Sequence, residues 1–185
     1  MDNGASSYRR FLDGDDKGIA EIVGEYKDGL ILYLNGYVNH ISMAEELAED
    51  TFFRLITRKP KYSGKSTFKS WLYAIGRNVA VDFVRHNSKI CSTPIEEMEN
   101  ELSEEQSLEQ SYIKEERKRI VHKALSRMPA DYRTVLWLMY FEGFSHKETA
   151  VILKKNERQM TNLLYRAKQS LKSKLEKEGF IYEEL

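Results

Sequence analysis

Apolar residues recur at three- and four-residue steps along most of this chain, and this spacing predicts helices. In the first half, the predicted helices run over about Lys17–Val38, Ser42–Thr57 and Thr67–His86, where Ser66 is the other candidate start of the third. No alternation of apolar and polar residues has the length of a strand. We therefore expect an all-α fold with three helices in the first half.

The helical spacing resumes in the second half of the chain. One predicted helix ends near Met128 and Pro129, and its apolar positions are Ile113, Ile120, Val121, Ala124 and Leu125. Another is predicted over Asp131–Phe141, after which Glu142 and Gly143 turn the chain. Gly179 is the expected stop of the last helix. Two helical bodies are therefore expected, one in each half.

Residues 145–171 have the pattern of two short helices that meet at a tight turn. Ser145 and Glu148 have capping-box spacing, and Asn156 with Gln159 can cap the second helix after a break. The polar face of that second helix carries Arg158, Gln159, Thr161, Asn162, Tyr165, Arg166 and Lys168. Such side chains can reach base edges and phosphates in the major groove. The pattern predicts a DNA-reading helix-turn-helix, and an ordinary helical hairpin with a solvated basic face is the alternative.

Charge is strongly segregated along the chain, although the net charge is zero. Residues 51–90 hold nine Lys or Arg against one acid, and residues 91–116 hold nine Glu against one Lys. Residues 117–180 hold fifteen basic and six acidic residues. Two basic segments separated by an acidic one indicate two polyanion-binding modules with a linker that repels the same polyanion.

The segment between the second and third predicted helices alternates cations with aromatic and hydroxyl side chains. It reads RKPKYSGKSTFKSW over residues 58–71. Cations hold phosphates, and aromatic rings can stack on unpaired bases. Tyr62 is the better candidate for a base contact because it lies in the loop itself, whereas Phe68 has the helical spacing of a core residue.

Composition excludes several other classes of protein. The single cysteine, Cys91, rules out an internal disulfide, and the four histidines lack metal-ligand spacing. Gly64-Lys65-Ser66 matches only the end of a phosphate-binding loop, because Lys59 stands where the earlier glycine is required. We expect no catalysis, no metal and no cofactor. Without a long apolar run or a secretion signal, the protein is expected to stay in the cytosol.

Five short motifs, taken in order, resemble the extracytoplasmic-function (ECF) group of bacterial RNA polymerase sigma factors. In the first half the motifs are AEELAEDTF at residues 44–52, and Phe68, Trp71, Leu72, Ile75, Arg77, Asn78, Asp82 and Arg85 at their spacing. In the second half they are ALxxMP at 124–129, the helix 132–141 with EGFS at 142–145, and RAKxxL at 166–171. The resemblance spans nearly the whole chain.

The resemblance implies a role for each segment. Residues 1–88 would form sigma region 2, residues 89–112 an acidic flexible linker, and residues 113–185 sigma region 4 with its helix-turn-helix. Docking on the clamp of the polymerase largest subunit would use Glu46, Leu47, Glu49, Asp50 and Phe53. Reading and melting of the minus-ten element would use Lys61, Tyr62, Lys65, Lys69, Arg77, Asn78 and Arg85. Recognition of the minus-thirty-five element would use Arg158, Gln159, Thr161, Asn162, Tyr165 and Arg166.

The family also implies three partners: core RNA polymerase, promoter DNA and, as a further candidate, an anti-sigma factor. The chain departs from the family pattern at Lys154 and Lys155, where a glycine and an apolar residue are usual in the turn, and at Thr161 and Leu163 in the reading helix. A free-standing helix-turn-helix regulator is the alternative function. An RNA-binding adaptor is disfavoured, because the reading helix suits the wide groove of DNA.

Overall fold

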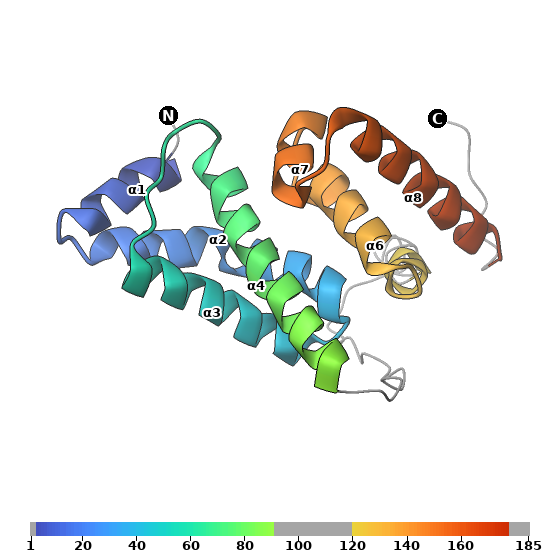
Figure 1. Ribbon diagram of the computed structural model, residues 1–185, viewed down its shortest axis with the longest axis horizontal. Coiled ribbons are helices and arrows are strands. Elements are labelled where there is room, and N and C mark those ends of the chain that lie inside the picture. The colour runs from blue at the N-terminus through green and yellow to red at the C-terminus, as the bar shows by residue number, and fades with distance from the viewer. Residues whose placement is uncertain (1–2, 91–119, 178–185) are drawn as a thin grey trace, which may run out of the picture.

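The computed structural model describes residues 3–90 and 120–177 (Figure 1). In these two ranges every regular element is a helix, which confirms the expected all-α class. The helices form two groups that lie side by side, α1–α4 and α6–α8. The predicted linker 89–112 falls outside the described residues except for its first two, which end α4, and so does Gly179.

The first group contains four helices, one more than the sequence predicted. They are α1 (Asn3–Leu12), α2 (Lys17–Val38), α3 (Ile41–Arg58) and α4 (Phe68–Ile90). The predicted ends of α2 are confirmed, and those of α3 lie within one residue of the predicted ones. α1 was not predicted. Its Tyr8 and Phe11 are buried in the same cluster of side chains as the inner residues of α2, α3 and α4, so it belongs to the same core.

The second group begins with a helical segment at residues 120–126 and continues as α6 (Ala130–Leu136), η1 (Trp137–Phe141), α7 (His146–Leu153) and α8 (Glu157–Lys177). The single helix predicted over Asp131–Phe141 is correct in extent but not in type. Its second half is a π-helix, in which the Trp137 and Phe141 rings stack with their centroids 4.2 Å apart.

The core runs continuously through both groups of helices. Leu30, Leu34 and Leu72 are fully buried in the first group, and Leu138, Ile152 and Met160 are fully buried in the second. All of them belong to one cluster of buried side chains. The two bodies predicted from the sequence therefore meet through a packed seam. Among the described helices, none is long and apolar enough to cross a membrane.

Candidate nucleic-acid interface

The helix-turn-helix has the local geometry that its capping residues predict. The Ser145 hydroxyl accepts a hydrogen bond from the Glu148 amide at 3.2 Å, and the Glu148 carboxylate accepts one from the Ser145 amide at 3.0 Å. Asn156 and Gln159 exchange the equivalent pair of bonds at the start of α8. Both helix starts are therefore fixed by side chains close in sequence.

The turn between α7 and α8 forms without the usual glycine. Lys154 adopts a left-handed conformation with φ of 53°, and its amide bonds to carbonyls of the last turn of α7. A non-glycine residue pays about 1 kcal/mol or more for this conformation. The neighbouring Lys155 forms an ion pair with Asp131, with the charged atoms 3.6 Å apart. The lysines that depart from the family pattern are thus compatible with a normal turn.

The polar face of α8 is open to solvent. Met160, Leu163 and Ala167 point into the core, so the opposite side of the helix faces outward. All six side chains predicted to read the minus-thirty-five element are exposed there: Arg158, Gln159, Thr161, Asn162, Tyr165 and Arg166. Tyr165, at 65% exposed, is a large ring without cover. A groove-reading helix needs a face of this kind.

The basic loop of the first group lies between α3 and α4. Lys61 and Lys65 are exposed, whereas Phe68 is fully buried, as its helical spacing predicted. The Tyr62 ring is half-buried, with its centroid 5.1 Å from that of Trp71 and 5.7 Å from that of Phe68. Its hydroxyl donates to the Ser66 carbonyl. Tyr62 therefore sits against an aromatic surface at the edge of the core and is partly exposed to solvent.

The predicted minus-ten residues on α4 differ in their exposure. Arg85 is exposed, and Arg77 and Asn78 are half-buried on the same helix. Lys69 is half-buried because the second group of helices covers it. These residues and the loop cations lie on two consecutive segments, but they do not form one continuous open face.

The predicted docking helix α3 presents most of its predicted contacts outward. Glu46 and Glu49 are exposed, and Phe53 is 62% exposed, which is unusual for a phenylalanine. Asp50 pairs with Arg54 across one turn at 3.0 Å. Leu47 is the exception: at 5% exposed it belongs to the core, because it lies on the same inward face as Ala44 and Phe52. Its side chain packs into the core beneath α3 and does not form part of the exposed surface of the helix.

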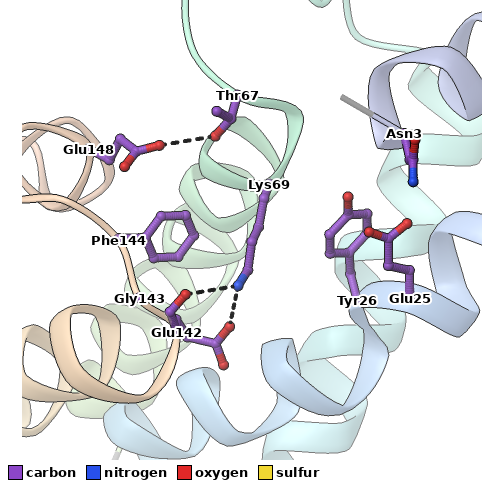
Figure 2. Close-up of a pocket in the computed structure, with 9 residues that line it drawn as sticks. All are labelled: Asn3, Glu25, Tyr26, Thr67, Lys69, Glu142, Gly143, Phe144 and Glu148. Carbon is purple, nitrogen blue, oxygen red and sulfur yellow. Dashed lines mark hydrogen bonds and ion pairs between the residues drawn. The ribbon is translucent and has the colours of Figure 1, made fainter. Parts of the chain in front are cut away.

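Glu142 is the centre of the seam between the two groups of helices (Figure 2). Its carboxylate lies 2.8 Å from the Lys69 ammonium and accepts a hydrogen bond from the Tyr73 hydroxyl at 2.8 Å. Lys69 also donates to the Glu142 carbonyl at 3.1 Å and lies 4.9 Å from the centre of the Phe144 ring. Burial, followed by the adjacent carboxylate, raises the pKa of Tyr73, which therefore stays a neutral donor.

Other polar contacts extend the seam in both directions. Glu148 accepts hydrogen bonds from Thr67 and Ser70 of the first group, each at 3.2 Å, while it caps α7. Hydrogen bonds from Ser145 are the main cause that lowers the pKa of Glu148 in the folded chain. The ionised Glu148 carboxylate therefore stabilises the fold at pH values above about 4.3, the ordinary pKa of a glutamate. This stabilisation is lost as the pH falls through the lowered pKa. Arg133 donates to the Gly36 carbonyl at 3.0 Å.

Sequence reasoning found Lys69 but missed its partners. The sequence pattern predicts only a turn at Glu142 and Gly143, and no sequence signal marks Tyr73 or Arg133. The one available signal was an acid in a segment that is otherwise basic, because residues 117–180 contain six acidic residues against fifteen basic ones. A sequence pattern could not pair that acid with a lysine 73 positions earlier.

Replacing Glu142 by Gln is expected to loosen the seam. The amide keeps a hydrogen-bond acceptor for Tyr73 but leaves the Lys69 ammonium half-buried without a counter-charge, which costs about 1–3 kcal/mol. The radius of gyration from small-angle X-ray scattering should rise. Asp131→Asn, which removes an exposed ion pair inside the second group, is the matched control and should leave it unchanged. Equal radii for Glu142→Gln and the wild type would show that the pair does not hold the groups together.

Comparisons with known proteins show to which family this arrangement of helices belongs. The family model for sigma-70 region 2 matches residues 22–90, and the model for sigma-70 region 4 matches residues 118–171. The sigma-H factor of Pseudomonas aeruginosa is 23% identical over 88% of this chain and 89% of the relative. The ECF sigma factor SigM of Bacillus subtilis is 28% identical over 84% of this chain and 93% of the relative.

Two solved structures share the fold. The sigma factor RpoE of Bartonella quintana, solved in complex with the anti-sigma factor NepR, has a TM-score of 0.71 at 21% identity, and the match covers 86% of this chain and 98% of that one. CnrH, solved with the cytosolic domain of CnrY, has a TM-score of 0.63 at 17% identity, over 94% and 95% of the two chains.

A group of helices that matches sigma-70 region 2, together with a helix-turn-helix whose basic face is open, defines a promoter-specificity factor of transcription initiation. This chain belongs to the sigma-70 family, in its extracytoplasmic-function group. It acts as a sigma factor, and the alternative of a free-standing helix-turn-helix regulator is set aside, because the first group of helices is itself a sigma region.

Proposed function

We propose that this sigma factor binds core RNA polymerase through α3, opens the promoter at the minus-ten element with the loop before α4 and with α4 itself, and reads the minus-thirty-five element with α8. Residues 1–88 form the docking and melting unit, residues 89–112 the linker, and residues 113–185 the upstream reader. The observation that carries the proposal is the open face of α8, whose six polar reading residues are all exposed above a buried apolar face.

The docking surface combines acids with one apolar anchor. Glu46, Glu49 and Asp50 supply negative charge, and Phe53 supplies a ring that is already exposed before any partner is present. Interfaces bind through such anchors, while the charges around them set orientation and association rate. A basic, partly apolar surface on the clamp of the polymerase largest subunit is the complementary partner.

The basic loop between α3 and α4, residues 59–67, is called the melting loop from here on, and it combines cations with a partly exposed ring. Lys61 and Lys65 can hold phosphates, and Tyr62 is a partly exposed ring of the kind on which an unstacked base can stack. Capture of an extruded base offsets the cost of unstacking it. Lys69, Arg77, Asn78 and Arg85 extend the contact along α4.

The two readers must separate when the promoter is bound. The minus-ten and minus-thirty-five elements are about 25 base pairs apart, which is about 85 Å of duplex at 3.4 Å per pair. A compact chain of this length has a radius of gyration of only about 16 Å. The Lys69 pair with Glu142 therefore breaks on the promoter, and phosphate replaces the carboxylate as the partner of Lys69.

The chemistry of transcription belongs to the polymerase in this proposal, and the chain has no active site and needs no metal or cofactor of its own. It works in the cytosol on the nucleoid. The structures of RpoE and CnrH contain their bound regulators, and we include an anti-sigma factor among the partners of this chain.

Transcription in vitro tests the proposed function directly. The purified chain is added to sigma-free core polymerase on a library of promoter fragments, and start sites are mapped. Specific starts that depend on both elements support the proposal. No start-site selection, together with no affinity for core polymerase, would overturn it.

Replacing Tyr62 by Ala is expected to slow strand opening about fivefold to a hundredfold, since a base stacked on an aromatic ring is worth about 1–3 kcal/mol. Binding to the closed duplex should change little, because the loop cations remain. Permanganate reactivity of unpaired thymines measures the opening. Ser63→Ala, at another exposed position of the same loop, is the control. Equal losses of opening and of duplex binding would contradict base capture.

A further inference from the structure

Helix α1 has no role assigned to it by the family match, which begins only at residue 22. It was also missed in the sequence, although the structure holds it firmly. Tyr8 is 1% exposed and Phe11 is 5% exposed. The added β-carbon of a residue larger than glycine at position 4 would lie 2.4 Å from the Phe68 ring, so the helix lies directly against the start of α4.

The inner side chains of α1 contact both ends of the melting loop. At the first end, the Tyr8 hydroxyl donates a hydrogen bond to the Pro60 carbonyl at 2.8 Å, and the Lys59 ammonium lies 5.0 Å from the centre of the Phe11 ring. At the second end, the Tyr8 ring lies 5.6 Å from Phe68 and 5.3 Å from Trp71, between ring centroids. Tyr8 thus joins the two ends of the loop through one side chain.

The same aromatic group supports the base-capturing ring. Tyr62 packs on Phe68 and Trp71, which are also the two rings that Tyr8 contacts. The loop leaves α3 through Lys59 in a left-handed conformation, φ 42°, followed by Pro60, whose φ is fixed. The Tyr8 bond to the Pro60 carbonyl comes immediately after this bend and fixes the direction in which the loop departs.

The donor is permanent at physiological pH. Burial raises the pKa of Tyr8 to about 12, so the hydroxyl keeps its proton. The contact is therefore a fixed structural bond and does not switch with pH.

We propose that Tyr8 is a positioning residue for strand opening: it holds the loop and Tyr62 in the arrangement that captures the extruded base. The inference rests on the proposed melting function of the loop. A loop ordered before DNA arrives does not have to lose its conformational freedom during capture, and this lowers the barrier to opening. Tyr8 itself does not touch DNA; it acts through Pro60, Phe68 and Trp71.

Tyr8→Phe tests the inference, because it keeps the ring and removes only the hydroxyl. Strand opening with core polymerase, followed by permanganate reactivity, should slow about threefold to tenfold, while affinity for the closed promoter and for core polymerase stays the same. The control is Thr51→Val, which removes another buried hydroxyl that donates to a backbone carbonyl, within α3 and outside the loop. It should lower stability without slowing opening.

A double substitution separates positioning from general destabilisation. If Tyr8 acts through the loop, Tyr8→Phe should add little to the defect of Tyr62→Ala, because the captured ring is already gone. The inference would be overturned if the two substitutions slowed opening by independent factors that multiply in the double variant, or if Thr51→Val slowed opening as much as Tyr8→Phe does. If Tyr62→Ala opened the promoter slowly but Tyr8→Phe opened it at the normal rate, the role of Tyr8 would be overturned and the melting function of the loop would stand. Normal opening by Tyr62→Ala would instead overturn the melting function and the role of Tyr8 with it.

Discussion

Reversing the charges of Glu49 and Asp50 to Lys is expected to abolish copurification of this sigma factor with core RNA polymerase. The two acids lie on the outward side of α3, in the turn before the exposed Phe53 ring. Lysines there would face the basic partner surface that the docking proposal requires, and like charges brought together at an interface cost several kcal/mol, which weakens binding by about a hundredfold or more.

The fold should survive this double reversal, because neither side chain is buried in the core. Asp50 loses its exposed pair with Arg54, a contact worth about 0.3–0.5 kcal/mol. The matched control reverses Asp13 and Asp16, two exposed acids at the turn between α1 and α2, and makes the same change in net charge. Retention of both variants on immobilised core polymerase checks the prediction. Undiminished binding of the α3 variant would reject α3 as the docking surface.

Replacing Gly18 by Ala should destabilise the first group of helices by about 2–4 kcal/mol. An added β-carbon would lie 2.2 Å from the Ser7 carbonyl oxygen and 2.9 Å from the Phe11 amide nitrogen. Both are backbone atoms of α1, which cannot rotate away as a side chain could. α1 and α2 would have to move apart, and the buried Phe11 side chain would lose packing.

Gly24 provides the control on the same helix. Nothing lies within 4 Å of a β-carbon added there, so Gly24→Ala should stabilise the chain by about 0.5–1 kcal/mol through helix propensity alone. Unfolding in denaturant, followed by circular dichroism, measures both variants. The same substitution is thus expected to lower the stability of the chain at Gly18 and to raise it at Gly24. A Gly18→Ala variant as stable as the wild type would mean that α1 does not pack as described.

The sequence predicted the helices whose signals are local. α2 has its predicted ends, and the capping box at Ser145 and the reciprocal caps at Asn156 and Gln159 form as expected. Capping involves residues three positions apart, and an apolar face repeats every three or four residues, so both are visible in a short window. The outward direction of the α8 reading face follows from the same periodicity.

α1 could not be predicted in this way, because it is short and carries few apolar residues. Ten residues with Tyr8 and Phe11 as the large inner side chains are too few for a stable isolated helix. It forms because α2 and α4 cover it, with Gly4 and Gly18 allowing close approach. On α2, Gly29 and Gly36 lie where Tyr73, Glu142 and Thr134 leave no room for a larger side chain.

By itself, the sequence determined the helical class, the two basic bodies, the helix-turn-helix and the family to which they belong, because these depend on periodicity, capping and charge within short stretches of chain. Only the tertiary structure decided that Lys69 is paired with Glu142 and that Tyr8 holds the loop. Each of these contacts joins elements whose spacing in the chain carries no signal. They form because packing of the helices brings particular surfaces together, and buried polar groups must then find partners on whichever surface they meet.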